Sequence, residues 1–446
     1  MTLSCLSPVF SIYGVGGDVL VHAGTGTFLL ALLGLGAALL WGFVYAELGS
    51  AFPYAGGDYV GVGRTLGGWA GAATLALWLA TMGPVIAFEC QIAATYAEEL
   101  VHGIAPALLT LFMLAAATLL AVLGVRTSAM VTGIFLSVEM IAVVTLIACG
   151  FWHPVRGAEI LLAAPRALSG GVMAPVSLGI LASALVNTAY GTVGGNQAIY
   201  FGEELRDPHR QIGRVIIAAA LTGGFATALP LVAVTIGAHD LSAVLASPAP
   251  FATFVSQCLG PWAAQALSAG VVLAIFNAII ATIMVGARLL FSVARDELLP
   301  AAANRLLSSV GSTSGVPSSA TLVIVAFSAL CCLLASHLLL VFISGLIVYG
   351  WGLVCFAVLV GRRKGLTGGT GLWRAPLYPL APLLGFLMAI EFAIANLADA
   401  TAGRPSVVLL GLVMTAAIIW YHKVLKKRGW QPRTSDVAQA NPLDHN

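Results

Sequence analysis

Long apolar segments separated by short polar loops recur along nearly the whole chain. A membrane-spanning helix needs about 20 mostly apolar residues, and the sequence contains twelve segments of that kind. Their predicted bounds are 5–23, 27–51, 69–97, 104–124, 127–151, 173–201, 212–237, 262–292, 319–336, 338–360, 376–398 and 405–422. The ninth and tenth form one apolar run that is interrupted only near Ser336 and His337, which we interpret as a tight turn. The pattern predicts an all-α membrane protein with twelve transmembrane helices.

The composition agrees with a lipid environment. Of the 446 residues, 59% are hydrophobic and 9% are charged, and the mean hydropathy is +0.99. Soluble domains are about 45–50% apolar and about a quarter charged, so a cytosolic enzyme, a disordered protein and a nucleic-acid binder are excluded. The net charge of +2 is too small to indicate a polyanionic partner. The seven cysteines lie almost entirely in apolar segments without a CxxC motif, so the sequence predicts no disulfide, metal centre or cofactor.

Basic residues predict the orientation, because cytoplasmic loops carry an excess of Lys and Arg. With the N-terminus inside, all of the 20 basic residues except Arg156, Arg166 and Arg404 fall in inner loops or in the C-terminal tail. Both termini are therefore expected on the cytoplasmic side of the cell (inner) membrane. The first segment is short and begins almost at Met1, without a basic region that would mark a signal peptide.

Two segments are interrupted by glycines at corresponding places. The first reads Gly14-Val15-Gly16-Gly17, and the sixth reads YGTVGGN at residues 190–196; each opens a set of five segments. Such paired interruptions indicate a transporter binding site near the middle of the bilayer, where unwound backbone offers amides and carbonyls to a substrate. Alternatively, the glycines only allow neighbouring helices to pack closely.

Three motifs occur in order along the chain. They read YAELGSAFPYAGGDY at residues 45–59, EELRDP at residues 203–208 and ARDELLP at residues 294–300. Together they resemble the signatures of the amino acid–polyamine–organocation permeases. The resemblance implies the leucine-transporter fold and secondary active transport. It implies a first inverted repeat over 1–151, a second over 173–361 and two further spans over 376–424. The polar residues of 429–446 predict a disordered cytoplasmic tail.

The chain also departs from the pattern of that family. Tyr190 keeps the first aromatic residue of the sixth helix, but Thr192 replaces the second. Glu139 stands where the fifth helix often has a lysine that occupies the place of a sodium ion. Glu89 matches a glutamate that several amino acid permeases have in the third helix. These departures leave open whether protons or sodium ions drive the transport.

Four carboxylates lie within apolar segments, namely Asp18, Glu89, Glu139 and Glu391, and no Lys or Arg lies at comparable depth. An unpaired charge in hydrocarbon is costly, so each should face the interior of the bundle and either take up a proton or meet a cation. We predict that Glu139 and Glu89 carry protons. Asp18 would bind a substrate amine or a proton. For Glu391 we favour a hydrogen-bonded structural role, and this role stays an alternative for the others.

The predicted substrate site combines both interrupted segments. It comprises Gly14, Val15, Gly16, Gly17, Asp18, Tyr190, Gly191, Thr192, Gly194 and Asn196. Backbone amides of the first segment would bind a carboxylate, and carbonyls near Tyr190 and Thr192 would bind an amine. Glu47 is interpreted as structural, through hydrogen bonds to loop amides. Histidines near the outer face, including His22 and His337, are interpreted as loop residues.

The sequence therefore predicts a permease for an amino acid or a related organic amine that works by proton-coupled symport. An obligatory exchanger on the same fold fits the same residues. A membrane-embedded enzyme is disfavoured, because neither an HExxH motif nor an intramembrane nucleophile–base set occurs. The expected partners are the substrate, protons and the lipid bilayer, and the sequence does not predict an oligomeric state.

Overall fold

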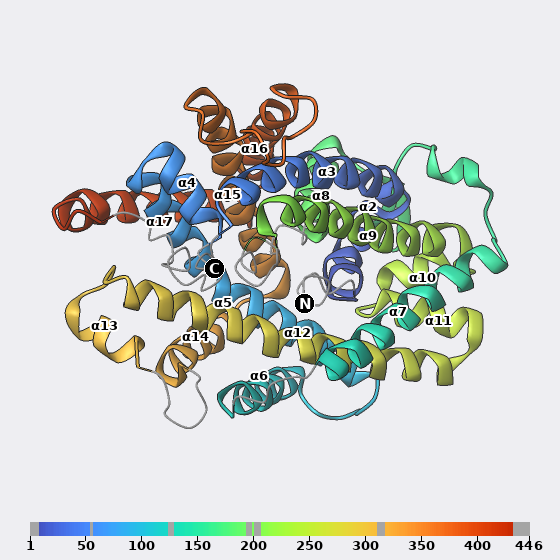
Figure 1. The fold of residues 1–446 in the computed structure, drawn as a ribbon. Helices are drawn as coiled ribbons and strands as arrows, with labels where there is room; N and C mark the ends of the chain where they lie inside the picture. Colours follow the sequence, from blue (N-terminus) through green and yellow to red (C-terminus); the bar gives the residue numbers. More distant parts are fainter. Residues whose placement is uncertain are drawn as a thin grey trace, which may run out of the picture.

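The computed structural model describes residues 9–53, 57–123, 129–192, 199, 207–309 and 317–430, which are mostly helical (Figure 1). The first half contains η1 (Phe10–Gly16), α2 (Gly17–Ala23), η2 (Gly24–Gly26), α3 (Thr27–Ala51), α4 (Asp58–Leu66), α5 (Gly68–Glu98), α6 (Pro106–Val122) and α7 (Ala129–Trp152). Then come η3 (Ala158–Leu161), β1 (Arg166–Ser169), β2 (Val172–Pro175), α8 (Leu178–Thr192) and α9 (Pro208–Gly237). The remainder contains α10 (Leu241–Ala246), α11 (Pro250–Leu259), α12 (Pro261–Arg295), α13 (Ala301–Leu307), α14 (Ser318–Cys331), α15 (Ser336–Arg363), α16 (Leu380–Ala398), α17 (Gly403–Trp420) and η5 (Tyr421–Leu425).

Each of the twelve predicted segments contains a helix. Within the described residues, seven helices are long and apolar enough to cross a membrane, and three shorter apolar helices accompany them. The count of twelve spans and the division into repeats stay predictions. Two predicted boundaries are wrong: residues 172–175 form β2 rather than helix, and the turn before α15 lies at 332–335, so that His337 is already helical.

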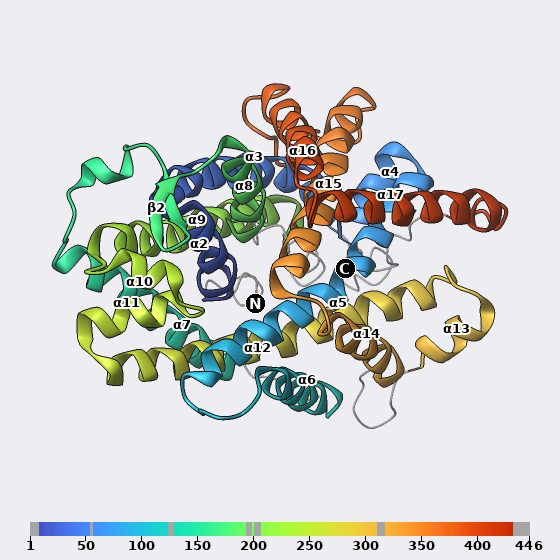
Figure 2. The same cartoon turned by 180° about the vertical axis from the view of Figure 1, so that it is seen from behind.

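Helix α5 runs through the middle of the protein and contacts α12, α15, α6 and α14. Figures 1 and 2 both show α5 beside α12, with α3 and α9 paired on the other side of the molecule. The hairpin of β1 and β2 contacts α2 and α10. This arrangement surrounds η1, the first described helix, with α5, α8, α9 and α12.

Small residues allow backbones to approach at the contact between α7 and α9. A Cβ atom at Gly150 would overlap the backbone of Ala233, and one at Gly237 would overlap Gly150 itself. Lipid provides no hydrophobic drive for such contacts, so van der Waals packing between small residues has to stabilise them. The interpretation that glycines serve close packing therefore applies to this pair of helices.

A buried ion pair ties α3 to α15. The Glu47 carboxylate is fully buried, and Arg362 donates to both of its oxygens at 2.7 Å. The hydroxyl of Thr367 donates to the same carboxylate at 3.0 Å, and the amide of Ala375 donates at 2.7 Å. The prediction that the Glu47 carboxylate hydrogen-bonds a loop amide is thus confirmed, and the amide of Ala375 is the donor. The ion pair with Arg362, which lies 315 positions away, was not predicted.

Substitution of Gly150 by Ala should destabilise the protein, because the added methyl group has to push α7 away from α9. Overpacking of this kind costs about 1–3 kcal/mol, and unfolding of the purified protein in detergent measures it. Gly36→Ala is the matched control: a Cβ there meets nothing within 4 Å, and alanine favours a helix over glycine by up to about 1 kcal/mol. Equal stability of the two variants would contradict the packing argument.

Replacement of Glu47 by Gln should lower the free energy of unfolding by about 3–5 kcal/mol, because Arg362 loses the partner of a buried charge. The same unfolding assay measures the loss. Glu98→Gln serves as the control, since Glu98 is exposed at the end of α5 and surface changes typically stay within about 0.5 kcal/mol. A Gln variant as stable as the control would show that the pair does not hold α3 to α15.

Candidate functional site

The first interrupted segment is wound rather than open. Gly16 (φ −63°, ψ −33°) and Gly17 (φ −62°, ψ −48°) are helical, and the amide of Gly17 donates to the carbonyl of Ile12, five residues earlier. The expectation of an unwound stretch at Gly14–Gly17 is therefore wrong for this structure, because a π-helix keeps these backbone groups bonded. The helical path breaks later, at Gly24, whose φ of +53° suits glycine.

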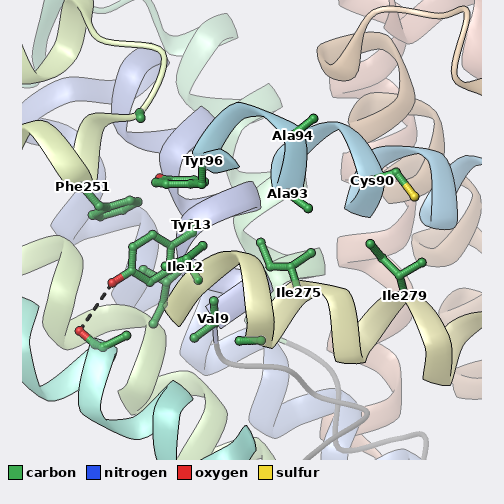
Figure 3. Close-up of a cluster of buried hydrophobic side chains, with 14 of the residues drawn as sticks. Val9, Ile12, Tyr13, Cys90, Ala93, Ala94, Tyr96, Phe251, Ile275 and Ile279 are labelled. Atoms are coloured by element: carbon green, nitrogen blue, oxygen red, sulfur yellow. Dashed lines mark hydrogen bonds between the residues drawn. The ribbon is translucent and has the colours of Figure 1, made fainter. Parts of the chain in front are cut away.

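Side chains from several helices enclose η1. Figure 3 shows Tyr13 between Tyr96 of α5 and Phe251 of α11. The ring centroids of Tyr13 lie 5.4 Å from Tyr96 and 5.1 Å from Phe251, both edge to face. The Tyr13 hydroxyl donates to the carbonyl of Ala142 in α7 at 3.4 Å. The predicted site segment thus lies inside the bundle and does not face its surface.

The two predicted segments meet at Gly191. A Cβ atom there would lie 2.9 Å from Cγ1 of Val15, so glycine lets α8 approach η1 closely. The hydroxyl of Thr192 lies 3.1 Å from each of three carbonyls that can accept its proton, that of Gly34 in α3 and those of Thr188 and Ala189 in its own helix. Tyr190 is half-buried. Gly194 and Asn196, like Glu203 and Glu204 of the second motif, lie outside the described residues.

Two carboxyls are buried close to η1, one in α5 and one in α7. Glu89 in α5 is 4% exposed, and one of its oxygens accepts a hydrogen bond from Thr282 of α12 at 3.0 Å. Glu139 in α7 is 2% exposed and accepts a hydrogen bond from the amide of Val9, which precedes η1. Within the described residues, the second oxygen of each carboxyl is buried without a partner. Neither carboxyl pairs with a Lys, Arg or His there.

Asp18 lies in the first turn of α2, two residues after the end of η1, and it belongs to a different polar cluster. Its carboxylate accepts hydrogen bonds from Nδ1 of His337 at 3.0 Å and from the Asn187 amide at 3.3 Å, and Nδ1 of His22 lies 3.5 Å away. The interpretation of His22 and His337 as loop residues is wrong, because both lie in helices. Asp18 and His22 are four positions apart, and this spacing places two side chains on the same face of a helix, so the sequence could have indicated their contact. Nothing in the sequence indicates that His337 contacts Asp18.

Glu391 does not face the interior. It is exposed on α16, among exposed apolar residues such as Leu387 and Ile390. The expectation that all four carboxylates point inward is therefore wrong for Glu391, because its side chain is exposed on a helix that lies at the edge of the bundle (Figure 1). The four carboxylates predicted within apolar segments thus divide into the buried pair Glu89 and Glu139, the histidine-bonded Asp18, and the exposed Glu391.

Comparison with known proteins finds relatives of one kind. The chain is 29% identical over 265 residues to the large neutral amino acids transporter small subunit 2 of Oryctolagus cuniculus, covering 57% of this chain and 48% of that protein. It is 29% identical over 293 residues to the Asc-type amino acid transporter 1 of Mus musculus, covering 63% and 54%. The chain thus spans about half the length of these relatives.

A bacterial relative is matched over more of its length. The branched-chain amino acid permease BcaP of Lactococcus lactis is 24% identical over 410 residues, which cover 84% of this chain and 83% of that permease. The sequence profile of the amino acid permease family matches residues 2–420, which include the three resembling motifs and every described helix except η5. This chain belongs to the amino acid permease family.

Proposed function

We propose that the protein is a secondary active transporter of neutral amino acids and that protons drive the transport. The observation that carries the proposal is the pair of buried carboxyls, Glu89 and Glu139, which lie around the first helix with one oxygen each unpartnered in the described part of the chain. An ionised carboxylate in such a place would be an uncompensated buried charge. A group that is stable there when protonated, and that becomes accessible during transport, can carry a proton.

The substrate site in this proposal surrounds η1 and the end of α8. Close packing of Gly191 on Val15 supports it, because it brings the two predicted segments together. The π-helix supports it as well, because π-helical turns occur frequently at functional sites. In the proposed cycle η1 is the element that opens for the substrate, and its amides then bind the carboxylate.

A zwitterionic substrate fits better than a polyamine. The mammalian and lactococcal relatives are named as transporters of neutral or branched-chain amino acids. Asp18, the acid that would bind a second amine, already accepts hydrogen bonds from His337 and Asn187. Family membership also favours transport over a membrane-embedded enzyme.

Reconstituted vesicles test the coupling. With the outside one pH unit more acidic than the inside, one proton per substrate can sustain about tenfold accumulation, since one unit corresponds to about 1.4 kcal/mol. Vesicles that contain the protein should accumulate labelled leucine to about that level. With Glu139→Gln or Glu89→Gln, the leucine concentration inside the vesicles should rise only to about the concentration outside. The glutamine amide fills the same space but cannot release a proton.

Glu391→Gln is the matched control, and it should accumulate leucine as the unmodified protein does, because Glu391 is exposed outside the proposed pathway. If both buried-site variants keep full gradient-driven accumulation, the proton assignment is wrong. Uptake that occurs only into vesicles preloaded with amino acid would instead establish an obligatory exchanger on the same fold.

Competition assays test the substrate class. Leucine, isoleucine and similar neutral amino acids should inhibit labelled leucine uptake at least about tenfold more strongly than putrescine or lysine, because an uncompensated second positive charge costs more than 1.4 kcal/mol in a buried site. Asp18→Asn should change the uptake of neutral and cationic compounds by similar factors. A selective loss of cationic uptake in Asp18→Asn would favour an amine transporter and contradict the neutral assignment.

A further inference from the structure

The cluster around Asp18 combines three side chains that ligate metals. One candidate ligand atom from each of Asp18, His22 and His337 lies within 4.8 Å of the others. Asp18 and His22 come from one face of α2, and His337 comes from the first turn of α15. We propose that these three residues form a binding site for a divalent transition metal ion of the Zn²⁺ type, separate from Glu89 and Glu139.

The spacing of the ligand atoms fits this coordination. Around a tetrahedral Zn²⁺ with bonds of about 2.0–2.2 Å, neighbouring ligand atoms lie about 3.3 Å apart. The Asp18 oxygen lies 3.5 Å from Nδ1 of His22 and 3.0 Å from Nδ1 of His337. The two imidazole rings are stacked, with centroids 4.9 Å apart. All three ligand atoms lie within 4.8 Å of one another, so the side chains have to close around an ion by rotation to contact it together.

A metal ion can take the place of the protons on Nδ1 of the two histidines. In the structure, Nδ1 of His22 donates to the backbone carbonyl of Asp18 at 2.8 Å, and Nδ1 of His337 donates to the Asp18 carboxylate at 3.0 Å. A neutral imidazole can carry its proton on Nε2 instead, which leaves a lone pair on Nδ1 for the metal. The ion then replaces two hydrogen bonds with two coordinate bonds.

The surroundings supply the remaining features of a metal site. Asn187 of α8 donates to the second Asp18 oxygen at 3.3 Å, and such outer partners orient a ligating carboxylate. All three ligands line a cavity of about 430 Å³, through which a metal and a water molecule as fourth ligand can enter. The side chains of His22 and His337 are 45% and 43% exposed, so the ion does not have to cross a closed core.

The charge of the cavity favours a cation. Asp399 lines it together with Asp18, and the described residues that line it include no Lys or Arg. Partial burial opposes ionisation of Asp399, but hydrogen bonds from the Thr401 hydroxyl and amide and from the Gly403 amide outweigh that effect and lower its pKa. Asp399 is therefore an anion whose oxygens accept hydrogen bonds from its own loop. It adds negative potential to the cavity but is not one of the proposed ligands.

Cobalt(II) gives a direct readout, because tetrahedral Co²⁺ with nitrogen and oxygen ligands absorbs visible light. Titration of the purified full chain in detergent with Co²⁺ should produce a saturable visible band at one ion per chain, and Zn²⁺ should remove it. His22→Ala and His337→Gln should abolish the band. Asn187→Ala should weaken binding by about 10–100-fold, as loss of an outer partner typically does.

His102→Ala is the matched control, since His102 is an exposed histidine in the loop between α5 and α6. This variant should bind Co²⁺ as the unmodified protein does. His337→Gln keeps a donor for Asp18, and unchanged melting of this variant without metal verifies its fold. The site is refuted if the unmodified protein shows no saturable band, or if the band survives in the His22→Ala/His337→Gln double variant. The titration involves no transport, so failure of the proposed function would not affect this result.

Discussion

The absence of water in the bilayer interior is the constraint on which the rest of this structure depends. A backbone amide or carbonyl in hydrocarbon has to find a partner within the protein. Around η1 that requirement is met by bonds that reach five residues back, as between Gly17 and Ile12, so a glycine-rich stretch stays wound. The first helix can therefore lie fully buried among α5, α8, α9 and α12.

The same constraint governs the side chains. Glu47 is buried only because Arg362, Thr367 and Ala375 occupy both of its oxygens. Glu89 and Glu139 are equally buried, yet each has one partner and one oxygen unpaired among the described residues. The first arrangement stabilises a permanent charge and holds two helices together. The second lacks the partners that a permanent charge would need, which is why we propose these two carboxyls as proton carriers.

Glycine lies where two helices approach closely, because helices in lipid associate through van der Waals packing and not through the hydrophobic effect. Gly150 and Gly237 allow α7 and α9 to touch through their backbones, and Gly191 allows α8 to meet η1 at Val15. The interpretation that glycines serve close helix packing therefore applies at all three positions. Gly191 lies where the two glycine-containing segments meet, so the proposed substrate site depends on the same close packing.

Local sequence alone determined which segments are helical, that the protein belongs in a membrane, and that Glu47 needs a loop amide, because hydropathy and the burial cost of a charge act over short stretches. The tertiary structure decided which distant residues meet: Arg362 with Glu47, Thr282 with Glu89, and His337 with Asp18. These partners lie between 193 and 319 positions apart, and only helix packing brings them together. It also decided that η1 stays wound and that Glu391 faces outward, because backbone bonding and exposure depend on the neighbours that surround each helix.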